Sequence, residues 1–249
     1  YCFRQTPVYE VTSAVYIQDN KGDNSNILLE SLGLSSYKKN IDNEIEVLRS
    51  KNQITDVVEA LNLYTSYSWN SFLRNVPLYE ETPIEAVLDS IDVRSLKASL
   101  NIRIKPQNGV FHLEVKTRNV RGDEVEICNT TVETFPYSIP FHKGFIRLRY
   151  TGDTIPTVDK TLNISLSNPR SVSKSIAGNL TVAFASKDAT ILKVVYRTPV
   201  IKAGEDFIKT LVDFYNIDAA KQKNQGTEKT QQFIDARLDS ISTDLSVVE

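Results

Sequence analysis

Short runs of alternating apolar and polar residues recur between residues 98 and 196, and they constrain the fold more than any other feature. The runs are Leu100/Ile102/Ile104, Phe111/Leu113/Val115, Leu162/Ile164/Leu166, Leu180/Val182/Phe184 and Ile191/Val195. Turn sequences rich in Gly, Asn, Asp and Pro separate them, at 106–109, 121–123, 151–153, 167–169 and 177–179. A period of two is typical of half-buried strands. We therefore expect an antiparallel β region with hairpins and one face in solvent.

The sequence before this region predicts one strand followed by two helices. Residues 7–19 alternate as a half-buried strand does, whereas residues 41–48 carry apolar side chains at helical spacing. Ser50 and Gln53 match a capping box, in which each side chain satisfies a backbone N–H at the start of a helix. A second helix is therefore expected from Ser50 to Leu61.

The sequence after this region is helical again. Residues 207–214 predict a helix that stops near Tyr215-Asn216, and a further helix is expected from Thr227 onwards. Apolar residues in this last segment follow steps of four and three, which is a heptad seam that packs against a partner helix. The seam residues are Ile234, Leu238, Ile241, Leu245 and Val248. Because neither Gly nor Pro interrupts the seam, we expect a long helix that continues beyond Glu249.

These patterns together predict an α+β fold. We expect a mixed or antiparallel sheet with packed helices, a β-rich insertion and the start of a long C-terminal helix.

Charge and hydropathy exclude some classes of function. The 29 basic and 31 acidic side chains are spread along the chain, with a net charge of −2, so no basic stripe exists to hold nucleic acid. No apolar run approaches the ~20 residues that span a bilayer. The first residues, Tyr1 to Arg4, have the aromatic and cationic character of a segment just outside a membrane span.

The sequence offers no catalytic, cofactor-binding or metal-binding motif. It contains neither a phosphate-binding GxxxxGK[ST] loop nor a GxGxxG or GxSxG motif. His112 and His142 lie in the β region, and the alternation places His112 on the solvent face. Cys2 and Cys128 lack metal-ligand spacing. We therefore predict no enzyme activity and no cofactor for this chain.

Five blocks in a fixed order resemble the chain-length-determinant (Wzz-type) family of polysaccharide biosynthesis. They are 7–11 with 17–19, 43–50 with 57–63, 186–192, 204–209 with 215–216, and 230–238. The second block reads Asn43-Glu44-Ile45-Glu46-Val47-Leu48-Arg49-Ser50. The resemblance covers roughly residues 7–97 and 186–249, so we expect one Wzz-like α/β domain formed by 1–97 and 186–249. It does not extend to residues 98–185, which we interpret as an enlarged β-rich insertion.

The resemblance implies the periplasmic part of an inner-membrane protein, with transmembrane helices flanking this segment. Proteins of this family form rings and regulate the chain length and export of O-antigen, capsule or exopolysaccharide together with the polymerase and export machinery. In the Wzc-like branch a cytoplasmic tyrosine autokinase follows. We accordingly expect a homo-oligomer with possible glycan contact. Its contacts are expected along the heptad seam and along the helices at 41–63, with Glu44 and Arg49 as candidate residues.

Three alternatives stay open from the sequence. The helices at 41–63 can pack entirely on their own sheet. The chain can also be a carbohydrate-binding or adhesin-like β module, with residues 98–185 as the binding part on a helical stalk. An enzyme such as a glycosidase would need a pair of carboxylates facing each other across a cleft, and adjacent acidic residues do not supply this.

Overall fold

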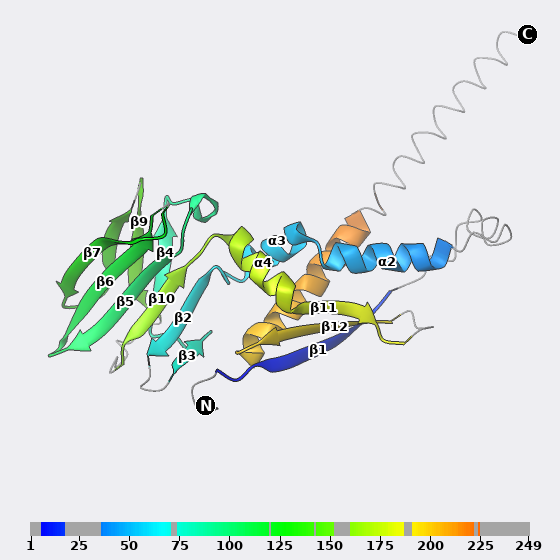
Figure 1. The fold of residues 1–249 in the computed structure, drawn as a ribbon, viewed down its shortest axis with the longest axis horizontal. Coiled ribbons are helices and arrows are strands. Elements are labelled where there is room, and N and C mark those ends of the chain that lie inside the picture. The colour runs from blue at the N-terminus through cyan, green and yellow to red at the C-terminus, as the bar shows by residue number, and fades with distance from the viewer. Residues whose placement is uncertain are drawn as a thin grey trace, which may run out of the picture.

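The protein consists of two units that lie side by side and meet near α3 and α4 (Figure 1). The structure, a computed structural model, describes residues 6–17, 36–70, 74–119, 121–141, 143–151, 160–186, 191–221 and 224. Helices and antiparallel sheets are both present, so the fold is α+β as predicted. The heptad seam and the rest of residues 227–249 lie outside the described residues, as do Cys2 and His142.

The first unit, called the α/β unit below, is built from both ends of the described chain. Its sheet has the antiparallel order β1-β12-β11. The full length of β1 pairs with β12, from Tyr9 opposite Thr198 to Tyr16 opposite Ile191. The strands are β1 (Tyr9–Tyr16), β11 (Leu180–Phe184) and β12 (Ile191–Thr198). The helices are α2 (Ser36–Leu48), α3 (Lys51–Ala60), α4 (Pro169–Asn179) and a helix over residues 201–221.

The helix over residues 201–221 buries one face in the core of the α/β unit. Phe207, Leu211 and Tyr215 are spaced four apart, so they share one side of the helix, and all three are buried. They pack in one cluster with strand residues such as Val15 and Leu192. The apolar spacing of this segment thus explains why the helix covers the sheet.

Gly204 brings this helix unusually close to the strands beneath it. A Cβ atom at this position would lie 2.7 Å from Thr198 Cγ2 and 2.8 Å from Val11 Cγ2. These distances are shorter than carbon–carbon contacts allow. The absence of a side chain at Gly204 is therefore what lets the start of the helix rest on β1 and β12.

The second unit, called the β sandwich below, comprises two antiparallel sheets. The large sheet has six strands in the order β3-β2-β10-β5-β6-β7, and the small sheet has three in the order β4-β9-β8. The large sheet contains β2 (Thr65–Asn70), β3 (Asn75–Leu78), β5 (Leu100–Gln107), β6 (Val110–Arg118), β7 (Glu124–Val132) and β10 (Leu162–Leu166). The small sheet contains β4 (Ile84–Asp89), β8 (Tyr137–Phe141) and β9 (Gly144–Tyr150). A short 3-10 turn, η2 (Val93–Ser95), lies between β4 and β5.

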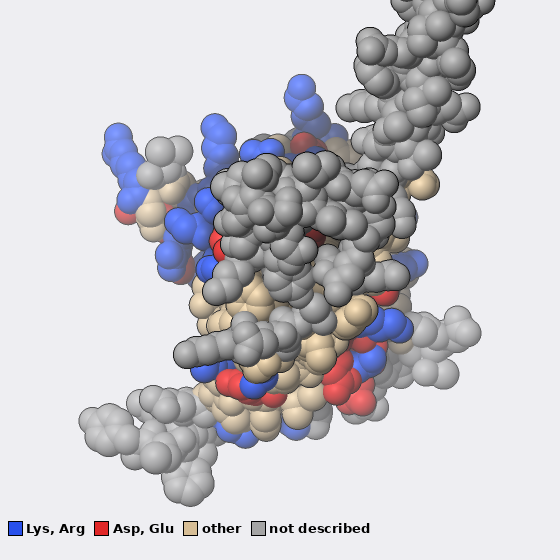
Figure 2. Space-filling view, turned by 90° about the vertical axis from the view of Figure 1, so that its right-hand side faces the viewer, with Lys and Arg blue, Asp and Glu red and all other residues tan. Residues whose placement is uncertain are grey.

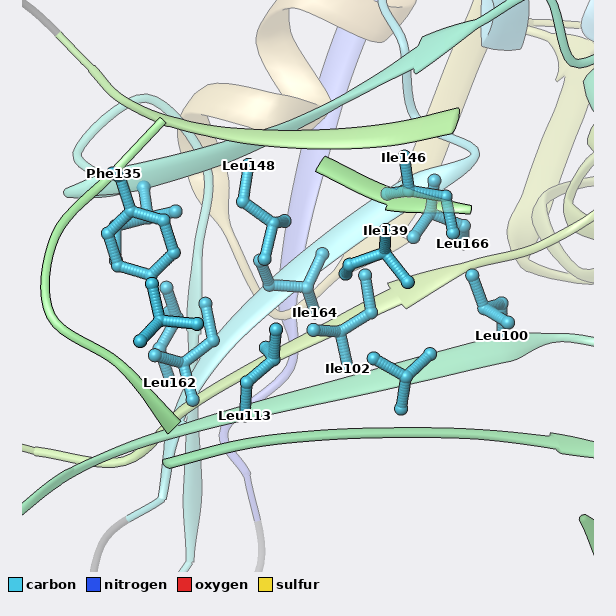
Figure 3. Packing of buried hydrophobic residues seen from close by; sticks show 14 of the residues in the cluster. Leu100, Ile102, Leu113, Phe135, Ile139, Ile146, Leu148, Leu162, Ile164 and Leu166 are labelled. Carbon is cyan, nitrogen blue, oxygen red and sulfur yellow. The ribbon is translucent and has the colours of Figure 1, made fainter. Parts of the chain in front are cut away.

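Branched aliphatic side chains fill the space between the two sheets (Figure 3). Ile146 and Leu148 of the small sheet face Ile102 and Ile164 of the large sheet, and each is 0–1% exposed. Burial of one such side chain contributes roughly 1.5–3 kcal/mol. The alternation predicted from the sequence therefore becomes one buried and one solvent face in each sheet.

The hairpin between β5 and β6 follows from the predicted turn sequence. Asn108 and Gly109 both have positive φ, at 52° and 81°. Two such residues match the right-handed twist of the flanking strands, which is why Asn-Gly favours this tight connection. The pairing then places Ile104 opposite Leu113 on the buried face.

Contacts at two places join the two units. At one of them Tyr79, just after β3, hydrogen-bonds to Asp206 on the helix over residues 201–221; the other lies around α3 and α4. The chain leaves the α/β unit next to where it returns, because Ser167 N donates to Tyr64 O at 2.8 Å. Asn168 caps α4 by accepting from Arg170 N, while its side-chain amide donates to Arg94 O at 2.7 Å. The Arg94 guanidinium in turn donates to both carboxylate oxygens of Glu59 on α3, at 2.6 and 2.5 Å.

The packing divides the chain elsewhere than at the expected boundaries of 98 and 185. Ile84 and Leu96 belong to the core of the β sandwich, whereas Ile176, Leu180 and Val182 belong to the core of the α/β unit. An alternating apolar pattern predicts that a strand has one buried face, but it does not predict whether that face packs in the core of the β sandwich or in the core of the α/β unit. The division by core therefore falls near residues 64 and 167.

Three local expectations differ from the structure. Residues 177–179, expected to form a turn between strands, are the last residues of α4. Residues 167–169 start α4 rather than a turn between strands, because Asn168 is an N-cap and Pro169 occupies the first helical turn, where a missing N–H costs little. The helix over residues 201–221 also continues through Tyr215-Asn216, where we expected it to stop. Asn216 is exposed there, so helical packing by its neighbours outweighs its weak intrinsic preference.

Candidate functional site

The solvent face of the large sheet carries a hollow of about 310 Å³, called the polar hollow below. Short hydroxyl and amide side chains from three neighbouring strands form its centre. These are Ser66 and Ser68 on β2, Asn163 and Ser165 on β10, and Asn101 on β5. The strand register sets them in rows, with Ser68 opposite Asn163 and Ser66 opposite Ser165.

Longer charged side chains form one side of the polar hollow. Glu114 on β6 receives hydrogen bonds from both Arg103 Nη1 at 2.9 Å and Lys116 Nζ at 2.5 Å. The hydrogen bond from Lys116 holds the pKa of Glu114 below its usual range, and the same contact raises the pKa of Lys116. Glu124 also lines the hollow, so two basic and two acidic side chains balance. The polar hollow is therefore lined by groups that can exchange hydrogen bonds and not by a field of one sign.

The sequence analysis did not identify the polar hollow. Its residues occupy the solvent positions of strands that alternation predicts, and Asn101, Asn163 and Ser165 stand where Lys and Glu are the common choice for a solvated face. This preference for short polar groups was the available signal. The register that joins β2 to β10 is long-range, so sequence spacing could not bring the two halves of the hollow together.

The candidate interface residues on α2 and just after it have different surroundings. The Tyr215 hydroxyl hydrogen-bonds to the half-buried carboxylate of Glu44, and burial together with this carboxylate raises the pKa of Tyr215 well above its ordinary value. Arg49 is exposed and makes no ion pair with another described residue. Glu44 thus has a partner within its own chain, whereas the side chain of Arg49 has none among the residues that the structure describes.

The corner between α2 and α3 is held by Gln53. Ser50 Oγ accepts from Gln53 N at 3.3 Å, as the capping box predicts. The Gln53 side chain is buried and does not return to the Ser50 backbone. With its amide nitrogen facing Val47, it donates to Val47 O at 2.6 Å and accepts from Tyr215 N at 2.9 Å. Gln53 therefore fixes the α2–α3 corner to the helix over residues 201–221.

The described residues include few groups suited to chemistry. They contain no cluster of three His, Cys, Asp or Glu side chains that could hold a metal ion. Burial raises the pKa of the Cys128 thiol, which disfavours the thiolate needed for nucleophilic attack. His112 is exposed on β6, in agreement with its predicted solvent position.

Family models and curated proteins supply no relative of this chain. No family model matches the chain, and no curated protein matches it.

Among the helices of the described residues, none is both long and apolar enough to cross a membrane.

Proposed function

We propose that this chain is the periplasmic, oligomer-forming part of an inner-membrane polysaccharide co-polymerase that regulates the length of a surface polysaccharide. In this role the chain carries out no reaction. Protomers associate side by side into a ring, and the ring limits how long a growing glycan stays in contact with its polymerase. The polysaccharide is an O-antigen, a capsule or an exopolysaccharide.

One observation carries this proposal. The sequence blocks that resemble the chain-length-determinant family are separated by the whole β sandwich, yet their described parts fold into one unit. Val57 of the second block, Leu192 of the third and Phe207 of the fourth belong to a single buried cluster, and Val11 of the first block packs against it. Blocks that matched by chance would have no reason to share a core, so their assembly favours a common structural role.

The surface of the α/β unit suits the heterologous contact that a ring requires. Closure into a ring needs two different complementary patches on each protomer. The end of α2 offers acidic Asp42 and Glu46 at exposed positions and the exposed cation Arg49. Figure 2 views the molecule from the end that carries α2, and both basic and acidic side chains lie on the visible surface. We propose that Arg49 pairs with an acidic group of the neighbouring protomer.

Deletion of the gene tests the function directly. The surface polysaccharide of the deletion strain is expected to lose its modal length, and reintroduction of the gene is expected to restore it. The measurement is the length distribution of the extracted glycan by gel electrophoresis. An unchanged distribution in the deletion strain would reject the function.

An Arg49→Glu variant of the full-length membrane protein tests the ring contact. The reversed charge is repeated at every interface of a ring, so we expect smaller oligomers by light scattering and a loss of modal length. Arg121→Glu is the matched control, because Arg121 is exposed on the hairpin between β6 and β7, in the other unit. If Arg49→Glu and Arg121→Glu both leave the oligomer intact, Arg49 is not at the interface.

A further inference from the structure

We infer that the polar hollow on the large sheet binds a polyhydroxylated glycan chain. Identification of this glycan as the surface polysaccharide rests on the proposed function, whereas the binding itself rests only on the geometry of the hollow. The inference gives the β sandwich a role of its own, as the part of the molecule that contacts the polymer.

Uncommitted hydrogen-bonding groups are the first argument. The side-chain amides of Asn101 and Asn163 make no hydrogen bond to any other described side chain or backbone group. Each amide offers two donors and one acceptor with two lone pairs. A sugar hydroxyl also donates and accepts, so an amide can satisfy two hydroxyl groups of one ring at once.

The regular spacing of these groups is the second argument. Asn163 lies opposite both Ser68 and Arg103 across the sheet, and Ser165 lies opposite both Ser66 and Asn101. Neighbouring strands are ~4.8 Å apart, and alternate residues of one strand are about 6.6 Å apart. The polar hollow is therefore a small lattice of hydrogen-bonding groups, which suits a repeating polymer better than one compact ligand.

The low entropic cost of fixing these side chains is the third argument. Ser and Asn have few rotatable bonds, so they lose less rotamer freedom on binding than Lys, Arg or Glu would. Asn163 and Ser165 are also half-buried at the centre of the sheet. A ligand that replaces their water therefore has few rotatable bonds to order.

The lining disfavours other classes of macromolecule. The two apolar residues of the lining, Ile102 and Ile164, are 1% exposed, so a peptide finds no apolar pocket for an anchoring side chain. Arg103 and Lys116 are engaged by Glu114, so a phosphate backbone meets no free positive field. A neutral or weakly charged glycan is the class that fits.

The described lining contains no aromatic side chain, and this sets the expected strength of binding. Without a ring to stack on a sugar face, one hollow binds weakly. Several hollows presented by one oligomer would hold a long chain much more firmly, because every attachment after the first is intramolecular. Weak single sites also let the polymer slide and leave, as a growing chain must.

Titration of the 249-residue chain with glycan tests the inference. The probe is the surface polysaccharide purified from the source bacterium and fragmented to short oligosaccharides, and polyethylene glycol of similar size is the control compound. We expect saturable shifts of the Asn101 and Asn163 side-chain amide signals by NMR with the oligosaccharides and none with polyethylene glycol. Equal shifts with both compounds, or none with the oligosaccharides, would overturn the inference.

Two variants locate the binding. Asn101→Ala with Asn163→Ala is expected to weaken binding roughly tenfold, because about two hydrogen-bonding groups are lost. Asn163→Leu keeps the volume of the side chain but not its amide, and it should also weaken binding. Ser138→Ala, on the solvent face of the small sheet, is the matched control and should bind as the native chain does. Native affinity in both hollow variants would overturn the inference.

The outcomes separate this inference from the proposed function. If the polar hollow binds glycan but the deletion strain keeps its chain-length distribution, the binding site stands and the co-polymerase function fails. If the deletion strain loses modal length but the polar hollow shows no binding of the oligosaccharides, the inference fails and the function stands.

Discussion

The two units of this protein are assembled in opposite ways. In the β sandwich, most neighbouring strands are also neighbours in sequence, as in the hairpins β5–β6, β6–β7 and β8–β9. In the α/β unit, β1 pairs with β12 across the whole of the intervening chain. Local pairings cost little loop-closure entropy, whereas the β1–β12 pairing must await a large closure. The β sandwich also has long-range pairings, such as β2 with β10, but its folding brings residues 64 and 167 together and so shortens the loop that the β1–β12 pairing must close.

The two units also carry separate spectroscopic reporters, which makes the comparison testable. Trp69 is the only tryptophan, and it packs against the core of the β sandwich. The α-helices of the described residues all belong to the α/β unit. Tryptophan fluorescence therefore follows the sandwich, and far-UV circular dichroism in the helical region follows the α/β unit.

Phe207→Ala has the largest expected effect. Phe207 is fully buried, and truncation of a buried Phe costs about 3–5 kcal/mol through lost burial and the cavity left behind. We expect the helical transition to move to lower denaturant concentration while the Trp69 transition moves far less. Equal displacement of both transitions would show that the units unfold together and would break the comparison.

Gly204→Ala is expected to have the next largest effect. The added methyl group meets Thr198 Cγ2 and Val11 Cγ2, so the helix must move off the sheet, at a cost of about 1–3 kcal/mol in the free energy of unfolding. Gly178→Ala is the matched control, because its Cβ would contact nothing within 4 Å on α4. Alanine favours a helix over glycine by about 1 kcal/mol, so Gly178→Ala should leave stability equal or higher. If both variants lower the free energy of unfolding, the cause is the replaced glycine backbone and not the contact of the added methyl group with Thr198 and Val11.

Glu59→Gln has the smallest expected effect and probes the contact between the units. It removes one charge of the Glu59–Arg94 pair, which is partly exposed, so the loss is below about 1 kcal/mol. We expect the two transitions to separate slightly. Glu10→Gln is the control, since the Glu10–Arg197 pair lies within the α/β unit and should not change that separation. If Glu10→Gln separates the two transitions and Glu59→Gln does not, the Glu59–Arg94 pair is not a contact that joins the two units.

The pH dependence of this contact has a defined sign. The hydrogen bond from Arg94 holds the pKa of Glu59 below its usual value of 4.5. A carboxyl group whose pKa is lowered by folding stabilises the folded state above its unfolded pKa, and this stabilisation disappears as the pH falls through the folded pKa. The difference in stability between the native chain and Glu59→Gln should therefore be constant near neutral pH and vanish in acid. Asp56 nearby has a pKa raised first by burial and next by the charge of Glu59, so its own contribution has the opposite sign and becomes smaller in Glu59→Gln.

Local rules predicted the elements better than they predicted their partners. Strands such as β5 and β6 follow from alternation, and the Ser50 cap follows from side-chain chemistry, because both depend on near neighbours in sequence. The start of α4 at Asn168-Pro169 was misassigned because the same two residues favour a turn and a helix N-terminus. Gln53 departs from the capping box because a distant backbone group, Tyr215 N, competes for its side chain.

The candidate sites show the same contrast between features that depend on near neighbours in sequence and features that depend on tertiary contacts. Exposure of His112 on its strand could be predicted, since it follows from alternation alone. The polar hollow could not, because it requires the register of β10 against both β2 and β5. The expected interface at Glu44 and Arg49 also depends on tertiary contacts, and the structure gives Glu44 a partner in Tyr215 that sequence spacing does not suggest.

The hydrogen bond between Ser167 N and Tyr64 O has a consequence for how such a protein can diversify. Because the two connecting segments touch, the chain enters and leaves the β sandwich at neighbouring points. Replacement of the β sandwich by another domain would leave the strands and helices of the α/β unit undisturbed, since chain ends that lie close together tolerate such replacement. Replacement of the β sandwich would therefore change what this unit contacts without altering the α/β unit.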